Sequence, residues 1–395
     1  MGGIIDYVTE YGTYSFMERA FSDEDSLALA QFSYMKLDGV VPELELTPEA
    51  GGETSAREAE RAGKAADGET ERAGRASDKE TERGVTLGEI CRRKSMEKLL
   101  EGDLFADSNY ALIEAMRESR RFQTITYKYY VNLIDHEAAS QFSAVTCFLA
   151  EGLVYVAFRG TDETLAGWRE DFAMAYETPV RSQKLAAQYL RAVADRCEGA
   201  LIIGGHSKGG NLAVYAAMHC GQDIRERIRL VYNLDGPGFP AQIRSSEAYR
   251  TIESRIRKIV PHSSVIGMLF EDAETYEVVE SSAFGVLQHN PFSWVVADGS
   301  FVSVKDVYRS RKKAAGILNS WLDSLTKEET ERTVEALFGI VEASQIQTLQ
   351  EFSGDWKGAL KKMLRAAAGI DRETRRELLD IVRTLIAAIG RYYRS

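Results

Sequence analysis

One segment of the sequence, Ala200–Leu212, reads ALIIGGHSKGGNL and carries both a structural and a chemical signal. Its apolar beginning predicts a short buried strand, and the small residues that continue from it predict a helix over 211–220. Between them Gly205, Ser207 and Gly209 form the pattern G-x-S-x-G. A strand, this pattern and a helix are typical of a nucleophile elbow, a turn so tight that side chains at the flanking positions would clash. We therefore expect the Ser207 hydroxyl to be held at the positive end of the following helix.

The regions around this segment alternate between predicted strands and predicted helices. Strands are expected at 143–149, 153–158, 228–234, 256–260 and 276–280. Helices are expected at 107–122 and 183–197. This alternation predicts an α/β fold, with a mostly parallel central sheet flanked by helices on both faces.

Composition divides the chain into four regions. Residues 1–46 are expected to form an N-terminal helical segment, in which Ser22 and the acidic residues after it mark a helix start. Residues 47–84 contain no Val, Ile, Leu, Met, Phe, Tyr or Trp and repeat an 11-residue unit, which predicts a charged, disordered insertion, with a regulatory tether as the alternative. The α/β core is expected at 85–309, followed by a helical region at 310–395.

The last predicted helix combines apolar and basic residues. Apolar side chains from Leu378 to Ile389 recur at helical spacing, and four arginines share the helix. Such a helix can make peripheral contact with a membrane surface. We expect it to pack on the body of the protein or on a partner, with membrane contact as the second possibility.

Charge and cysteine content exclude several classes of protein. The 395 residues include 49 Lys and Arg against 60 Asp and Glu, a net charge of −11, which argues against nucleic-acid binding. The four cysteines are widely spaced, as suits a reducing compartment, and no metal-ligand cluster is present. The sequence shows no signal-peptide pattern and no apolar run of about 18 residues. We therefore predict a cytoplasmic protein that needs no metal and no organic cofactor.

A nucleophilic serine needs a base, and the sequence offers five histidines. His289 is the leading candidate, because it lies in a turn-rich loop after the last expected core strand, and His262 is the alternative. His206 is expected to pack in the core and His219 to lie at the surface. His136 precedes the elbow, whereas the order serine, acid, histidine is typical of α/β-hydrolases.

The candidate acid is Asp235, at the end of the strand that follows the elbow. Catalytic groups collect at the carboxyl ends of strands in an open α/β sheet. Asp235 also precedes Gly-Pro-Gly, so a purely turn-forming role stays open. Glu271 and Asp272 are the next candidates, and Asp298 is the third.

An oxyanion hole requires two donors. The backbone N–H of Lys208, directly after the serine, is one candidate, and Thr161 at the end of the expected strand 153–158 is the other. The Lys208 side chain is expected to be a solvated charge.

These motifs carry a family resemblance. The run FRGT at 158–161, then Gly167, Trp168 and Asp171, and then GHSKGG resemble the class 3 lipase group of α/β-hydrolases. More narrowly, the chain is similar to the bacterial Mbeg-like proteins over about residues 20–46 and 100–310. Three further segments share the resemblance: Leu234–Phe239, Pro261–Leu269 and Gln288–Trp294.

The resemblance implies an α/β-hydrolase fold with Ser207 as nucleophile and His289 as base, acting on carboxylic esters or lipids. Class 3 lipases usually carry their acid in an Asp-x-Val-Pro segment, where this chain has Ser263 and Ser264. That departure favours Asp235. The leading hypothesis is therefore a serine esterase or lipase with a small-molecule or lipid ester as substrate. A thioesterase, a peptidase and a non-catalytic scaffold that binds a partner are the alternatives.

Overall fold

The computed structural model describes five continuous stretches of the chain: residues 2–46, 83–135, 140–161, 177–262 and 276–304. It also describes positions 170, 174, 264, 266, 267, 326, 328, 329 and 376. The predicted insertion at 47–84 and the predicted helical region at 310–395 lie outside the described residues except for a few positions.

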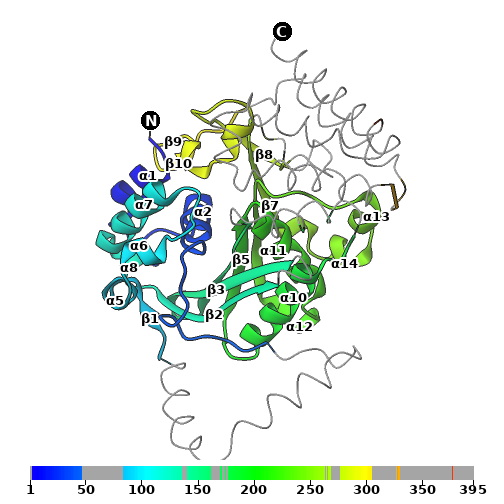
Figure 1. The fold of residues 1–395 in the computed structure, drawn as a ribbon, viewed down its shortest axis with the longest axis horizontal. Coiled ribbons are helices and arrows are strands. Elements are labelled where there is room, and N and C mark those ends of the chain that lie inside the picture. Colours follow the sequence, from blue (N-terminus) through cyan, green and yellow to red (C-terminus); the bar gives the residue numbers. More distant parts are fainter. Residues whose placement is uncertain are drawn as a thin grey trace, which may run out of the picture.

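An eight-stranded sheet forms the centre of the described part, with its strands side by side in sequence order (Figure 1). The strands are β1 Val85–Thr86, β2 Thr126–Asp135, β3 Ser140–Ala150, β4 Leu153–Phe158, β5 Ala200–His206, β6 Ile228–Leu234, β7 Ile256–Pro261 and β8 Glu277–Val279. Strands β1 to β4 pair antiparallel, and β4 to β8 pair parallel. The sheet is therefore mostly parallel, as predicted, with an antiparallel extension on one side.

The strand β2 was not predicted. Its sequence, TYKYYVNLID, mixes polar and aromatic residues without a continuous apolar run, and its last residues are partly exposed. Tyr129 interrupts its register with β3, because it has a left-handed φ of 58° where the pairing shifts between Lys128 and Val131. A bulge of this kind breaks the alternation by which a half-buried strand is recognised.

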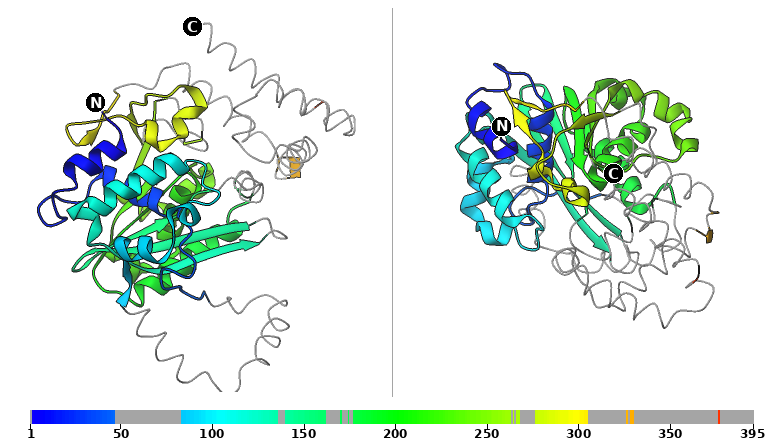
Figure 2. Two further views of the ribbon diagram at one scale, coloured as in Figure 1. Left: turned by 60° about the vertical axis from the view of Figure 1, so that its left-hand side comes forward. Right: turned by 90° about the horizontal axis from the view of Figure 1, so that it is seen from above.

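Helices cover both faces of the sheet, as predicted (Figure 2). One face holds α1 Ile4–Tyr11, α2 Asp23–Phe32, α5 Leu87–Arg93, α6 Met96–Leu99, α7 Ala106–Glu118 and α8 Arg120–Gln123. The other face holds α10 Arg181–Ala194, α11 Lys208–His219, α12 Gln222–Arg227, α13 Ala241–Arg244 and α14 Glu247–Arg250. No helix of the described residues is long and apolar enough to cross a membrane.

The expected helix start at Ser22 is confirmed. Ser22 is the N-cap of α2, its hydroxyl accepts from the N–H of Asp25, and the Asp25 carboxylate accepts from the N–H of Ser22 at 2.8 Å. This reciprocal capping begins a helix that is buried from Glu24 to Phe32.

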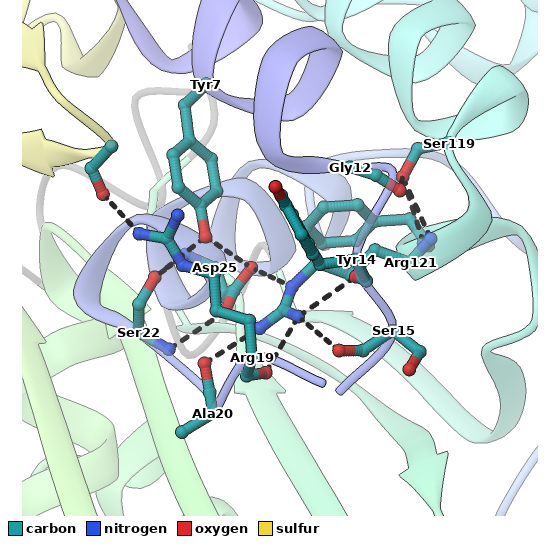
Figure 3. Close-up of polar contacts among 12 residues, drawn as sticks. Tyr7, Gly12, Tyr14, Ser15, Arg19, Ala20, Ser22, Asp25, Ser119 and Arg121 are labelled. Atoms are coloured by element: carbon teal, nitrogen blue, oxygen red, sulfur yellow. Dashed lines mark hydrogen bonds and ion pairs between the residues drawn. The ribbon is translucent and has the colours of Figure 1, made fainter. Parts of the chain in front are cut away.

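A buried ion pair holds this helical face together (Figure 3). The Arg121 guanidinium and the Asp25 carboxylate are both fully buried, and Arg121 Nε donates to Asp25 Oδ1 at 2.7 Å. The remaining guanidinium N–H groups donate to four backbone carbonyls, those of Tyr14, Ser15, Arg19 and Ala20. Because a buried charge is tolerated only when it is paired and hydrogen-bonded, this cluster fixes the connection between α1 and α2.

The last described segment returns to the N-terminus. The 3-10 turn η1 Glu253–Arg255 precedes β7. After the 3-10 turns η2 Gly285–His289 and η3 Pro291–Ser293, the hairpin of β9 Val296–Ala297 and β10 Ser300–Phe301 lies beside α1 (Figure 1). The N–H of Gly2 donates to Val296 O at 2.9 Å, and the N–H of Phe301 donates to Glu24 Oε1 at 2.6 Å. The loop that carries His289 is thereby anchored to the N-terminal helices.

Candidate active site

Ser207 occupies the turn between β5 and α11. The strand ends at His206 and the helix begins at Lys208, earlier than the predicted start at residue 211. Ser207 has φ 58° and ψ −133°, which costs a residue with a side chain strain of about 1–3 kcal/mol. Its N–H donates to Leu234 O at 2.9 Å, which ties the turn to the neighbouring strand β6.

The two glycines that flank Ser207 are required by close packing. A Cβ on Gly205 would lie 2.4 Å from the carbonyl oxygen of Phe158, and a Cβ on Gly209 would lie 2.1 Å from the same atom. The end of β4 therefore passes directly against the turn. This contact explains why the G-x-S-x-G pattern needs glycine at both positions.

His289 lies between Ser207 and Asp235. Its Nε2 is 3.0 Å from Ser207 Oγ, and its Nδ1 is 2.6 Å from Asp235 Oδ2. The His289 side chain is 25% exposed, whereas the Asp235 side chain is fully buried. The structure thus brings together the three residues that the sequence analysis selected as nucleophile, base and acid.

The Asp235 carboxylate is held on its other side as well. The Ser264 hydroxyl donates to Asp235 Oδ1 and accepts from the N–H of Gly267 at 2.8 Å. The backbone of Asp235 has a left-handed φ of 51°, and its N–H donates to Ile259 O at 2.8 Å. Ser264, in the segment where the resemblance places the acid of class 3 lipases, therefore orients the carboxylate of Asp235, the residue that follows β6.

The His289 loop is fixed by its neighbours. The buried Gln288 donates from Nε2 to Ala283 O at 2.8 Å, and its backbone carbonyl accepts from the Trp294 indole at 3.0 Å. His206 is buried, as predicted, and its Nε2 lies 3.0 Å from the carbonyl oxygen of His289. The two imidazole rings are 4.7 Å apart between centroids. The residue before the serine therefore supports the loop that carries the histidine.

Burial of His206 predicts a pH dependence of stability. Burial, and to a lesser degree the neighbouring His289, holds the pKa of His206 well below its usual value. The unfolded chain binds a proton at this histidine below pH of about 6.5, whereas the folded protein does not, so stability falls as the pH drops below that value. The expected loss is at most about 1.4 kcal/mol per pH unit. Urea unfolding of wild type and His206→Gln between pH 7.5 and 5.5 measures it, and equal pH slopes in both proteins would contradict the prediction.

The other candidate histidines and acids lie elsewhere. His262 follows β7 with its Nε2 3.1 Å from Gln288 Nε2, and His219 is exposed near the end of α11, as predicted. Asp298 is exposed in the turn between β9 and β10. Three further candidates lie outside the described residues: His136, Glu271 and Asp272.

The prediction of a solvated Lys208 side chain is wrong. This side chain is 1% exposed, and its Nζ lies 3.1 Å from the carboxylate of Glu170 and donates to Gln141 O at 3.1 Å. The start of α11 faces the start of β3, so the side chain turns inward between them. Sequence reasoning missed Glu170: it stands between Trp168 and Asp171 of the family motif, but that motif does not include position 170 and gave it no role.

The segment that ends at Thr161 lies against the elbow. A Cβ on Gly160 would be 2.7 Å from the carbonyl oxygen of His206. The close approach places residues 158–161 beside the nucleophile turn, although the roles of Thr161 and the Lys208 N–H stay predictions. Among the described residues, no group of three or more His, Cys, Asp or Glu side chains could hold a metal ion.

Comparison with known proteins assigns the family. A sequence model described as Mbeg1-like matches residues 116–339, more than half of the chain. The protein belongs to the Mbeg1-like family. The predicted family is thereby confirmed, and the sheet with its strand–Ser207–helix turn confirms the predicted α/β-hydrolase fold. Comparison with curated protein sequences gives no match.

Solved structures similar to this family member include several lipases. A fungal lipase–inhibitor complex, described as a model for interfacial activation, is 17% identical over 43% of this chain and 68% of its own, with a TM-score of 0.30. A propeptide complex of Rhizomucor miehei lipase is 14% identical over 46% and 68%, with a TM-score of 0.30. M37 lipase is 13% identical over 68% and 94%, with a TM-score of 0.32.

Proposed function

We propose that this protein is a serine hydrolase that cleaves carboxylic esters through an acyl-enzyme intermediate. The observation that carries the proposal is the hydrogen-bonded series from Ser207 Oγ to His289 Nε2, at 3.0 Å, and from His289 Nδ1 to Asp235 Oδ2, at 2.6 Å. A serine next to a base that is oriented by a third group is the arrangement that nucleophilic catalysis needs. The substrate would be a small-molecule or lipid ester.

Each member would have its own role in the reaction. His289 Nε2 takes the Ser207 proton while Ser207 Oγ attacks the acyl carbonyl carbon, and the resulting tetrahedral intermediate carries an oxyanion. The same proton then passes from His289 to the alkoxide leaving group, which departs as the alcohol. Water attacks the acyl-enzyme by the same route and releases the acid and free Ser207.

Asp235 would act as the orienting acid. Its Oδ2 accepts from His289 Nδ1, which leaves Nε2 as the nitrogen that faces Ser207. Its Oδ1 accepts from Ser264, so the carboxylate keeps one orientation as the imidazolium forms. Glu271 and Asp272 become candidates only if Asp235 proves dispensable.

The oxyanion would be bound beside the start of α11. Lys208 is the first residue of that helix, and its backbone N–H directly follows the proposed nucleophile. The second donor would be Thr161, on the segment that packs against the elbow. Both would stabilise the charge that develops on the carbonyl oxygen.

Covalent labelling tests this proposal. A fluorophosphonate probe at neutral pH should label wild-type protein, and mass spectrometry should place the adduct on the peptide that contains Ser207. The Ser207→Ala variant should remain unlabelled, because the probe needs an activated serine. Absence of labelling in folded wild-type protein would contradict the proposal and favour a non-catalytic scaffold.

The leaving group requires a separate test, because the same three residues attack thioesters and peptides. A panel of p-nitrophenyl esters, acyl-CoA thioesters and peptides decides between them. The ester assignment predicts the highest kcat/KM for a member of the ester series.

A further inference from the structure

A buried charge pair lies directly beside the proposed nucleophile. The side chains of Lys208 and Glu170 are 1% and 4% exposed, and Lys208 Nζ lies 3.1 Å from Glu170 Oε2. Removal of two charges from water costs several kcal/mol per ion, and a buried ion pair is often no more stabilising than apolar side chains of similar volume. The stability of the fold therefore gives no sufficient reason for this pair.

The Glu170 carboxylate joins four parts of the chain. It accepts from the Ser140 hydroxyl at 3.0 Å and the Gln141 N–H at 3.0 Å, both at the start of β3. It also accepts from the Ser182 N–H at 2.9 Å, in the first turn of α10, and from the Lys208 ammonium at the start of α11. Glu170 itself belongs to the connection between β4 and α10.

These contacts keep the carboxylate charged. Burial acts to raise the pKa of Glu170, but the Lys208 ammonium and the N–H groups of Gln141 and Ser182 together hold it below its usual value. Glu170 is therefore an anion at neutral pH, and it accepts hydrogen bonds from three donors in addition to Lys208.

One of the two proposed oxyanion donors, the N–H of Lys208, belongs to a residue of this pair. Lys208 is the residue whose backbone N–H follows the serine, and its side chain is anchored by Glu170 and by Gln141 O. The pair thus ties the start of α11, which carries this N–H, to the start of β3.

We propose that the Lys208–Glu170 ion pair is the positioning device of the oxyanion hole. It holds the start of α11, and with it the Lys208 N–H, at the place where the tetrahedral oxygen develops. The inference rests on the proposed function, and it makes Lys208 and Glu170 positioning residues whose side chains do not touch the substrate.

A second buried pair in the same chain serves as a matched control. Arg121 and Asp25 are both fully buried, and their partners all lie on the helical face formed by α1, α2 and α8 and the connections between them (Figure 3). Helices α10 and α11 pack on the opposite face of the sheet. A role limited to stability would make the two pairs equivalent. Only the Lys208–Glu170 pair should affect the reaction.

The experiment compares wild type with two double variants and one conservative variant. Lys208→Met with Glu170→Gln removes both charges together, so that neither is left buried alone, and Arg121→Met with Asp25→Asn does the same at the control pair. Glu170→Asp keeps the charge but shortens the anchor, and supplies a folded test if the double variant does not fold. The readouts are kcat and KM for p-nitrophenyl butyrate, and the Ki of a trifluoromethyl ketone, whose adduct with Ser207 places an oxyanion in the hole.

Both Lys208–Glu170 variants should lower kcat by about 10- to 100-fold with KM changed by less than about twofold, because a misplaced oxyanion donor acts on the transition state alone. The Ki of the ketone should rise by the same factor as kcat/KM falls. The control variant should lower the urea midpoint and leave kcat of the folded protein within about twofold of wild type.

The outcomes separate this inference from the proposed function. Wild-type labelling at Ser207 together with unchanged kcat and Ki in folded Lys208–Glu170 variants would overturn the positioning role and leave the hydrolase assignment intact. An equal loss of kcat in the control pair would also overturn it. Absence of labelling in wild type would overturn the proposed function, and the inference with it.

Discussion

The Ser207→Ala variant is expected to lower kcat for ester hydrolysis by about 10⁵- to 10⁶-fold, to a level close to the detection limit. Alanine removes the oxygen that lies 3.0 Å from His289 Nε2, so no acyl-enzyme can form. What remains is the catalysis that substrate binding and the oxyanion donors provide by themselves, about 10³- to 10⁴-fold over water. Initial rates with p-nitrophenyl butyrate, at enzyme concentrations high enough to exclude contaminating activity, measure the effect.

The same variant should keep its fold. The substituted alanine would have to adopt the same left-handed backbone, with φ near 58°, that Ser207 already adopts, so no new strain arises at the turn. Circular dichroism and urea unfolding check this. A folded variant that retains more than about a tenth of the wild-type kcat would show that Ser207 is not the nucleophile.

Replacement of Asp235 by asparagine has the second-largest expected effect, a fall in kcat of about 10⁴-fold. Asp235 accepts from two donors, His289 Nδ1 and the Ser264 hydroxyl, and an amide has a single oxygen for that purpose. If the amide nitrogen faces the imidazole, it donates to Nδ1 and leaves the proton on Nε2, the nitrogen that must take the proton from Ser207. The wrong tautomer then dominates.

The measurement is kcat/KM for Asp235→Asn from pH 6 to 9, with Asp298→Asn as the control. Asp298 was also considered as an acid from the sequence, but it is exposed in the β9–β10 turn, so its replacement should leave kcat/KM within about twofold of wild type. Retention of more than about a tenth of the activity by Asp235→Asn would transfer the acid role to Glu271 or Asp272.

The features that the sequence predicted correctly are mostly local ones. The turn at Ser207 was predictable, because a strand, two glycines and a helix are adjacent in the chain. Both glycines are needed because a Cβ at either position would clash with the end of β4. The parallel strands β4 to β8 were predictable from short apolar runs. The strand β2 was missed because a bulge at Tyr129 and partial exposure remove the regular alternation.

The residues of the candidate site are far apart in the sequence and meet only in the folded chain. The sequence favoured His289 over His262, and His289 does lie beside Ser207, although 82 residues separate the two. Asp235 was predicted only from its place at the end of a strand. Nothing in the chain near Ser264 indicated that its hydroxyl would hold Asp235 Oδ1. Such a contact depends on how β6 and β7 align.

The sequence by itself therefore determined the nucleophile turn, because the turn rests on residues adjacent in the chain. It also determined the α/β-hydrolase fold and the family, because the alternating runs and the motifs from Phe158 to Trp294 can be read without knowing which residues meet in space. The tertiary structure alone decided the environment of the Lys208 side chain. A lysine after the serine suggested a solvated charge, yet the start of β3 and Glu170 enclose it. Burial of a charge depends on partners brought from distant parts of the chain, and no local pattern records which carboxylate will meet it.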